Sequence, residues 1–373
     1  MDSMKLEDCC EILDSQRVPI TGSDRTSGDY PYYGANGIQD YVDDFIFDDE
    51  LVLLAEDGGN FGSKTRPIAY RVSGKCWVNN HAHVLKPKAG LDVDYLCYSL
   101  MFYDVGGMVN GATRQKLTQA AMRQMIIPKR SLDEQIEIVN IIKKVQGVIA
   151  SRKEELEQLD LLIKARFVEM FGDININDKN WKYEPLGELC TIVRGGSPRP
   201  IEQFLGGDVP WIKIGDATDG DSIYLNSTKE HIIQEGIKKS RLVKEGSLIF
   251  ANCGVSLGFA RIITFDGCIH DGWLAMEDID ERLDKVFLLQ ALNQMTEHFR
   301  AIAPAGTQPN LNTAIMKAYK QIIPPIELQR EFINFAKQVT KSKVAVQKAL
   351  NETQILFEFI NAGVFWIKFL DCI

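Results

Sequence analysis

The chain has 373 residues, with 45% hydrophobic and 25% charged side chains, and a formal net charge of −9. This length exceeds what one ordinary core needs and predicts two or three domains, while the composition excludes a disordered chain. No apolar run approaches the roughly 18 residues of a membrane span. An acidic total excludes a uniformly basic nucleic-acid binder and predicts weak unaided DNA binding, because affinity for phosphate depends on local clusters of Lys and Arg.

The first predicted element is a globular segment over residues 1–130. It opens with the acidic stretch MDSMKLEDCCEILD, which lacks the basic and apolar parts of a secretory signal, so we expect a cytoplasmic protein. Strand-like runs at Leu51–Gly59 and in the alternating Cys76–Pro87 flank a glycine-rich turn. Short strands mixed with a few helices, without regular strand–helix alternation, predict an α+β domain.

A long helix is predicted next, over residues 131–172. Apolar residues recur there at steps of three, four and seven, without any proline. Ser131 followed by Glu134 is a capping-box pattern, and Gly172 is a typical C-terminal glycine. At about 1.5 Å per residue, the helix would be a rod of roughly 60 Å.

The second half repeats this order. A second α+β segment is predicted over residues 173–325, with strands at Gly246–Gly254 and Phe259–Gly267, and a second long helix over 326–373. Two helices of similar length predict an antiparallel coiled coil, because each follows its own domain and parallel helices would bring the domains into collision. The alternative is that each helix belongs separately to a compact domain.

Sequence matches between the halves support a duplication. Residues 111–122 (GATRQKLTQAAM) and 305–316 (AGTQPNLNTAIM) match at an offset of 194 residues, and Gln135 matches Gln329 at the same offset. Weaker matches join the IIP motif at 126–128 to that at 322–324, at offset 196, and residues 6–12 to 186–192, at offset 180. A period near 190 residues indicates a duplicated domain, which suits a target that itself has two parts.

Motifs for catalysis are missing from the sequence. There is no methyl-donor loop, no Asn/Asp-Pro-Pro-aromatic quartet and no GxxxxGK[ST] phosphate loop, so we expect no catalytic residues and no cofactor. The eight cysteines form no CxxC pairs and are expected to be reduced and buried. His81 and His83 share one face of a predicted strand, with His270 at the matching place, but no third ligand stands out. We therefore expect no metal and favour packed or hydrogen-bonded histidines.

Polar loops in both halves carry the candidate nucleic-acid contacts. Tyr32, Tyr33 and Asn36 lie in YPYYGANG, and Trp211 and Lys213 lie in VPWIK at about the equivalent point of the second half. Aromatic and amide side chains beside cations suit contacts with base edges and sugars. The cations expected to reach phosphate are Lys64, Arg66, Arg114, Lys116, Arg194, Arg199, Lys238, Lys239 and Arg241. The alternative for each cluster is an ordinary solvated surface.

Over essentially its whole length the chain resembles the specificity subunits of type I restriction-modification enzymes. The resemblance rests on the order of YPYYGANG, the GATRQKL and AGTQPNL segments that close the domains, the IIP motif before each helix, and LDLLIKARFVEMFGD at the end of the first helix. The chain departs from that pattern at its end, FINAGVFWIKFLDCI, which has no FGD motif.

The resemblance implies a non-catalytic subunit with two target-recognition domains, each reading one half of a split double-stranded DNA sequence. The two helices would act as a spacer between them, along DNA whose turn measures about 34 Å. It also implies docking of two methyltransferase subunits and of restriction subunits that translocate DNA. The alternative function is a coiled-coil adaptor that joins proteins without reading DNA.

Overall fold

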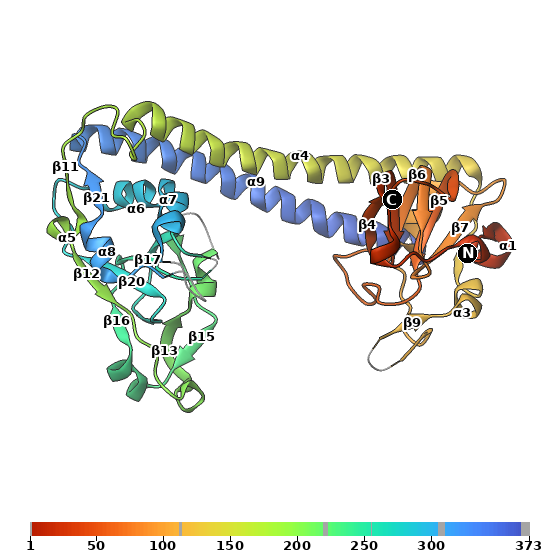
Figure 1. Ribbon diagram of the computed structural model, residues 1–373, viewed down its shortest axis with the longest axis horizontal. Helices are drawn as coiled ribbons and strands as arrows, with labels where there is room; N and C mark the ends of the chain where they lie inside the picture. Colours follow the sequence, from red (N-terminus) through yellow and green to blue (C-terminus); the bar gives the residue numbers. More distant parts are fainter. Residues whose placement is uncertain (1, 112–113, 219–222, 255, 305–309, 367–373) are drawn as a thin grey trace. The chain divides into compact units, whose positions relative to one another are not determined.

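The computed structural model describes residues 2–111, 114–218, 223–254, 256–304 and 310–366, with side chains up to residue 360. It divides into two compact units, residues 1–152 with 349–373 (unit 1) and residues 153–348 (unit 2). Two long helices, α4 (Leu132–Phe171) and α9 (Ile326–Trp366), each contribute residues to both units (Figure 1). Within the described residues, no helix is both long and apolar enough to cross a lipid bilayer.

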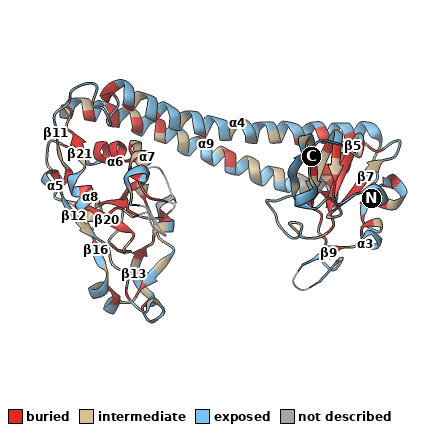
Figure 2. Ribbon diagram, viewed as in Figure 1, coloured by how far each residue is buried: buried red, intermediate tan, exposed pale blue. Residues whose placement is uncertain are grey.

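Unit 1 is built around a six-stranded sheet with the strand order β2-β7-β5-β6-β3-β4. These strands are β2 (Cys10–Ile12), β3 (Ser27–Gly34), β4 (Gly37–Val42), β5 (Phe47–Ala55), β6 (Ala69–Val78) and β7 (Ala82–Pro87). All neighbours pair antiparallel except β3 and β6. Side chains of β5 alternate between two buried clusters, with Val52 and Leu54 in one and Leu51 and Leu53 in the other. The strand is therefore covered on both faces, and Figure 2 shows β5 and β7 as buried.

Smaller elements complete unit 1. They are β1 (Ser3–Lys5), α1 (Leu6–Cys9), α2 (Val93–Met101), β8 (Val109–Asn110), β9 (Lys116–Leu117), α3 (Gln119–Arg123) and β10 (Ile126–Pro128). Helix α2 begins at Asp92, whose side chain accepts a hydrogen bond from the Tyr95 amide, and it packs on the Val52 and Leu54 face of the sheet. Strand β1 pairs with β10 just before α4 begins.

Unit 2 repeats this plan with its strands in two sheets, β12-β20-β17-β18-β14 and β15-β13-β19-β16. The strands are β12 (Thr191–Arg194), β13 (Leu205–Ile212), β14 (Tyr224–Leu225), β15 (Glu230–Ile232), β16 (Arg241–Val243), β17 (Leu248–Ala251), β18 (Ala260–Ile263), β19 (Gly267–Ile269) and β20 (Trp273–Glu277). Helices α5 (Leu186–Leu189), α6 (Lys285–Gln294), α7 (Thr296–Ile302) and α8 (Thr313–Ala318) and the pair β11 (Tyr183–Pro185) and β21 (Lys320–Ile322) complete it. Helix α6 lies between the first sheet and the long helices, within one core (Figure 1).

Strand register establishes which residues of the two units are equivalent. Tyr32 and Tyr33 run parallel to Trp77 and Val78 of β6, just as Trp211 and Ile212 run parallel to Cys268 and Ile269 of β19. The predicted equivalence of the YPYYGANG and VPWIK loops is thus confirmed. Ile12 pairs with Leu85, and Ile192 pairs with Met276. The offset between equivalent residues is therefore 180 for β2 and β12, and 191 for their partner strands β7 and β20.

Two details of the sequence interpretation are wrong. Cys76–Pro87 is not one strand, because β6 ends at Val78 and β7 begins at Ala82, with His81 in the turn between them. His81 and His83 consequently lie in different surroundings, and their equivalents are Gly272 and Leu274, not His270. The IIP motifs are also out of structural register. Ser3 pairs with Pro128 and Tyr183 with Ile322, so the offset there stays at 194.

A buried glutamine at an equivalent position of each unit fixes the start of each long helix. Ser131 and Glu134 form the predicted capping box, with the Ser131 amide 2.8 Å from Glu134 Oε2. One turn later, Gln135 Oε1 accepts from the Asp92 amide at 2.8 Å, and Gln135 Nε2 donates to the Gly90 and Arg130 carbonyls. Gln329 repeats this with the Asp284 amide and the Arg282 and Pro324 carbonyls. Both glutamines are fully buried, so each anchors a helix to the domain that precedes it.

Within each unit the two long helices pack against each other. In unit 2, Phe167 and Phe171 of α4 contact Phe332 of α9 with ring centroids 5.3 and 5.6 Å apart, while Lys343 pairs with Asp160 and Arg166 with Glu331. These pairs run in opposite directions along the chain, so the helices are antiparallel, as predicted. In unit 1, Val139 and Ile142 of α4 share a cluster with Phe357 and Ile360 of α9. The side chains of FINAGVFWIKFLDCI beyond Ile360 lie outside the described residues.

Candidate nucleic-acid interface

Three predicted contacts of unit 1 converge on the segment that follows β5. Lys116 Nζ lies 2.9 Å from Glu56 Oε1, Arg114 Nη2 lies 3.0 Å from Asp57 Oδ1, and Asn36 Nδ2 donates to the Gly58 carbonyl at 3.0 Å. Arg114 and Lys116 remain about half exposed, at 58% and 51% of their side chains. A cation from β9, a second from the segment just before it, and an amide from the β3–β4 turn therefore form one polar surface at the end of β5.

The backbone explains why these residues meet. The Leu117 amide donates to the Glu56 carbonyl at 2.7 Å, and an isolated antiparallel bridge joins Asp57 to Lys116. Gly58 has a φ of +61°, and a Cβ at this position would lie 3.3 Å from the Arg114 guanidinium. The positive φ favours glycine here, whereas the flexible Arg114 side chain could move aside. The GATRQKL segment is thus attached along the end of β5, although residues 112–113 of that motif lie outside the described residues.

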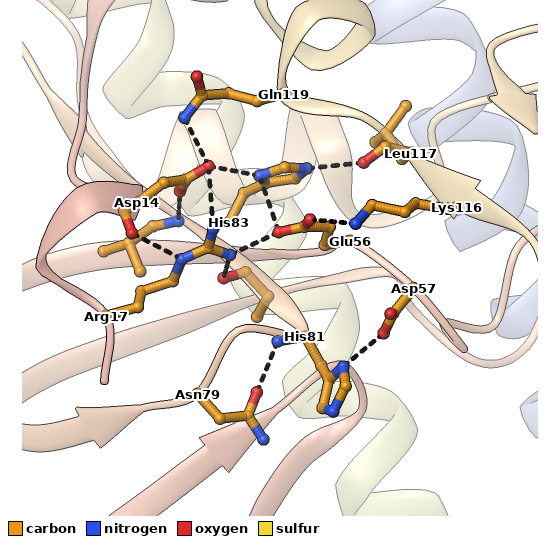
Figure 3. Close-up of polar contacts among 12 residues, drawn as sticks. Asp14, Arg17, Glu56, Asp57, Asn79, His81, His83, Lys116, Leu117 and Gln119 are labelled. Atoms are coloured by element: carbon orange, nitrogen blue, oxygen red, sulfur yellow. Dashed lines mark hydrogen bonds and ion pairs between the residues drawn. The ribbon is translucent and has the colours of Figure 1, made fainter. Parts of the chain in front are cut away.

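A buried ionic network lies directly beneath this surface (Figure 3). His83 is fully buried, with Nδ1 2.7 Å from Asp14 Oδ2 and Nε2 2.9 Å from the Leu117 carbonyl. Both neighbours are acceptors, so both ring nitrogens donate and the imidazole is positively charged. Arg17 Nη1 donates to Glu56 Oε2 at 2.6 Å and to the Ala82 carbonyl at 2.7 Å. Two cations and two carboxylates thereby satisfy one another inside the sheet.

This arrangement favours the ionised carboxylates. Burial raises the pKa of Asp14, but the hydrogen bond and charge of His83 outweigh it and leave the pKa below its ordinary value. Burial likewise raises the pKa of Glu56, and the hydrogen bonds from Arg17 and Lys116 bring it below its ordinary value. Ligand atoms of Asp14, Glu56 and His83 all lie within 4.8 Å of one another, as metal ligands do. However, Arg17 already pairs with both carboxylates, so the network is better suited to its own cations than to a metal ion.

Unit 2 gathers its cations around His270 instead. Burial lowers the pKa of His270, Asp271 raises it, and the charges of Lys213, Arg199 and Arg194 lower it again, with a net decrease. Arg194 Nε donates to the Asp271 carbonyl at 3.0 Å, and Lys213 Nζ lies 2.6 Å from Glu230 Oε1. Three of the predicted cations thus share one neighbourhood, at the turn before β20.

The close approach of these loops depends on two glycines. A Cβ on Gly195 would lie 2.1 Å from the His270 carbonyl oxygen, and one on Gly196 would lie 2.9 Å from the Lys239 carbonyl oxygen. Ser240 Oγ donates to the Gly196 carbonyl at 2.7 Å and so attaches the strand that follows Lys239. The VRGGSPRP loop can therefore lie flat between the turn before β20 and the Lys238–Arg241 segment.

The remaining candidates differ in accessibility. Tyr32 and Trp211 are only 1% and 3% exposed, and the Tyr32 hydroxyl bonds to the Ile20 backbone, so these rings support the loops from within. Tyr33 is partly buried and stacks on Tyr70, with ring centroids 5.7 Å apart. Exposed cations at hand for a ligand are Lys64, Arg66, Arg199, Lys238, Lys239 and Arg241. Asp14, Arg17 and Glu56 were missed from the sequence, because sheet register and not spacing brings them to His83.

Comparison with known proteins identifies the family. The family model described as "Type I restriction modification DNA specificity domain" matches residues 1–161 and again residues 178–353. The chain belongs to this family. A Haemophilus influenzae protein named as a type I restriction enzyme specificity subunit, S.HindORF215P, is 30% identical over 88% of this chain and 85% of its own length. The MjaIX specificity subunit of Methanocaldococcus jannaschii is 23% identical over 76% of this chain and 71% of its own.

Solved structures of specificity subunits share the fold. The type I restriction-modification S subunit from M. genitalium superimposes with a TM-score of 0.56 at 14% identity, covering 98% of this chain and 96% of that one. A chain from a structure of type I restriction-modification complex assembly reaches a TM-score of 0.63 at 16% identity, with 96% of both chains covered. The protein is therefore a DNA specificity subunit, the non-catalytic component of a type I restriction-modification system.

Proposed function

We propose that this specificity subunit reads a bipartite double-stranded DNA target, one half with each domain. The first domain (residues 1–130) would read one half-site and the second (173–325) the other, while the helices at 131–172 and 326–373 act as spacer. The observation that carries this proposal is the duplicated frame, in which each unit gathers cations beside strand ends: Arg114 and Lys116 after β5 in unit 1, and Arg194, Arg199 and Lys213 near the turn before β20 in unit 2. Such side chains suit phosphate and base-edge contacts.

Within each domain we assign the contacts by accessibility. Arg114 and Lys116 in the first domain, and Arg194, Arg199 and Lys213 in the second, would bind backbone phosphates close to the strand ends. The other exposed candidates would extend these contacts: Asn36, Lys64, Arg66, Lys238, Lys239 and Arg241. Tyr32, Tyr33 and Trp211 would hold the loops in shape, since their rings are buried or stacked.

We further propose that two methyltransferase subunits, and restriction subunits in the full complex, dock on the long helices. Large apolar side chains remain exposed there. On α4 they are Leu132, Ile136, Ile141, Val148, Leu161, Leu162 and Val168, and on α9 they are Val344, Ile355, Leu356 and Phe359. Exposed apolar residues on a helix already paired on its other side are typical of a protein interface. These partners would supply the chemistry and added positive surface, and the assembly would act in the cytoplasm.

The test is co-expression with the methyltransferase subunit of the same restriction-modification system, followed by base-resolution mapping of methylated adenines. We expect one motif made of two specified parts separated by an unspecified gap. Replacing residues 1–130 by the first domain of another family member should change one part only. A stable complex with methyl donor that leaves DNA unmodified would contradict the proposal, and so would a domain exchange that alters both parts.

A further inference from the structure

His81 differs from the surrounding polar residues because a hydrogen bond orients its ring through one nitrogen, while the other nitrogen has no partner among the described residues. It lies in the turn between β6 and β7, where its amide donates to Asn79 Oδ1 at 2.8 Å and its carbonyl accepts from the Glu56 amide at 2.9 Å. Its Nδ1 is 2.6 Å from Asp57 Oδ1, and its side chain is 32% exposed. Hydrogen bonds therefore fix both the backbone and the ring (Figure 3), while part of the side chain faces solvent.

The partner of Nδ1 determines what the rest of the ring can do. An ionised carboxylate only accepts hydrogen bonds, so Nδ1 must carry the hydrogen that joins it to Asp57. In the neutral imidazole Nε2 is then an acceptor. Among the described residues, Nε2 has no hydrogen-bond partner. The turn between β6 and β7 therefore presents Nε2 of His81 as a hydrogen-bond acceptor of fixed orientation.

The surroundings of His81 indicate the ligand. Arg114 Nη2 donates to Asp57 Oδ1, the same oxygen that bonds to the His81 ring, and it lies 3.4 Å from His81 Nδ1. The Asn36 side chain donates to the carbonyl of Gly58, which follows Asp57. A cation that can bind phosphate and a neutral amide thus flank a group that can read a base edge. In the major groove, hydrogen-bond donors are the exocyclic amino groups of adenine (N6) and cytosine (N4).

We propose that His81 is a specificity-determining residue of the first domain, accepting a hydrogen bond at Nε2 from the exocyclic amino group of an adenine or cytosine. Asp57 is its positioning residue, since it fixes the tautomer and the ring direction. This inference rests on the proposed reading of DNA by this domain. In unit 2, Gly272 and Cys253 occupy the places of His81 and Asp57, so the effect belongs to one half-site.

The experiment uses the full chain in complex with its methyltransferase partner and maps methylation for His81→Ala, His81→Gln and Asp57→Ala. For His81→Ala we expect one base pair of one half-site to become degenerate, with discrimination falling about tenfold. Asp57→Ala should relax the same base pair, and His81→Gln, which keeps an acceptor oxygen, should relax it less. The matched control is His231→Ala, an exposed histidine of unit 2, which should leave the motif unchanged.

The outcomes separate this inference from the function on which it rests. A uniform loss of methylation without change of motif, or full methylation with the original motif, would overturn the role of His81 and leave bipartite reading intact. If the unaltered complex showed no bipartite motif, the proposed function itself would be wrong. If the variants failed to fold, long-range ¹⁵N–¹H spectra of the histidine-labelled protein would decide. They should show hydrogen on Nδ1 of His81, and hydrogen on Nε2 with Nδ1 bare would overturn the inference.

Discussion

The two domains share one frame and differ at the ends of its strands. In unit 1, Asp14, Glu56 and His83 form a buried ionic network with Arg17. The equivalent positions in unit 2 hold Arg194, Asn252 and Leu274. Leu274 is as fully buried as His83, and Arg194 is exposed and turns to the Asp271 carbonyl. The same backbone therefore tolerates an ionic or an apolar filling at its centre.

What does not vary is the attachment of the helices. Gln135 and Gln329 make corresponding hydrogen bonds to the cap of the helix on the sheet and to the turn before the long helix. The frame is therefore held by buried apolar strands and these glutamines. The polar residues at the strand ends are consequently free to differ between domains, as the proposed reading of two different half-sites requires.

The largest effect should come from reversing charge at the proposed phosphate contacts. Arg114→Glu with Lys116→Glu, or Arg194→Glu with Arg199→Glu, should lower the DNA affinity of the complex about 100-fold, because attraction to two phosphates becomes repulsion. Binding titrations at several salt concentrations measure the loss. Lys5→Glu with Lys88→Glu, at the other end of β7, is the matched control. Unchanged affinity in both interface variants would favour the adaptor alternative.

The ionic network should make the stability of unit 1 sensitive to the loss of its buried histidine, whereas unit 2 has leucine at the equivalent position. His83→Leu copies the residue of unit 2 but leaves Asp14 and Glu56 with less positive charge, so the free energy of unfolding of unit 1 should fall by about 3 kcal/mol. Hydrogen exchange of β5 and β7 measures this loss. The control, His231→Leu on the surface of unit 2, should cost less than about 0.5 kcal/mol. Equal stability of His83→Leu and the unaltered chain would contradict the charged state of His83.

The glutamine anchors should respond alike in both units. Gln135→Ala and Gln329→Ala each remove three hydrogen bonds and leave buried backbone groups without partners, so each should cost about 2 kcal/mol in its own unit. The loss of stability in each unit is measured by thermal unfolding, monitored by hydrogen exchange in α2 for unit 1 and in α6 for unit 2. A difference between the two variants above about 1 kcal/mol would show that the equivalence of the anchors is only geometric.

Acid should produce the smallest effect, again in unit 1. The carboxyls of Asp14 and Glu56 have pKa values below their ordinary 3.8 and 4.5 in the folded chain. Their contribution to stability is therefore complete above the ordinary values and is lost as the pH falls through the lower, folded ones. Below pH about 4, the melting temperature of unit 1 should fall a few degrees more than that of unit 2. Glu184 and Asp280 of unit 2 also have lowered pKa values, each about 2, but they are surface carboxyls that share Arg282, and solvent screens such pairs so that losing them costs little. A larger fall in unit 2 would contradict this.

The sequence was informative where structure follows local pattern. The first long helix is predicted over 131–172 and found at Leu132–Phe171, because the capping box and the C-terminal glycine act locally. The Gln135 and Gln329 match was visible as a repeat, although its hydrogen bonds were not. Composition also points to the loops carrying Arg114, Lys116, Arg194 and Arg199, and their role as DNA contacts stays a prediction.

The rest depends on long-range register, which spacing does not reveal. Alternation across residues 76–87 suggested one strand, but the Asn79–His81 turn divides it and separates His81 from His83. The aromatic rings of Tyr32 and Trp211 have the composition of surface groups but are buried. The Tyr32 ring lies beneath Arg25 with its hydroxyl on the Ile20 backbone, and Trp211 packs in a cluster with Phe204, Ile232 and Cys268. Asp14 and His83 are 69 residues apart, so their contact exists only once the sheet has formed.

The discontinuity of unit 1 has a consequence for synthesis. The apolar face of α4 that contains Val139 and Ile142 is covered in part by Phe357 and Ile360, which are synthesised only after the whole of unit 2. Until then, a nascent first domain exposes this apolar face of α4, to which a chaperone or a second nascent chain can bind. We expect chains interrupted before residue 350 to aggregate, unless the missing turns of helix are supplied in trans as a peptide.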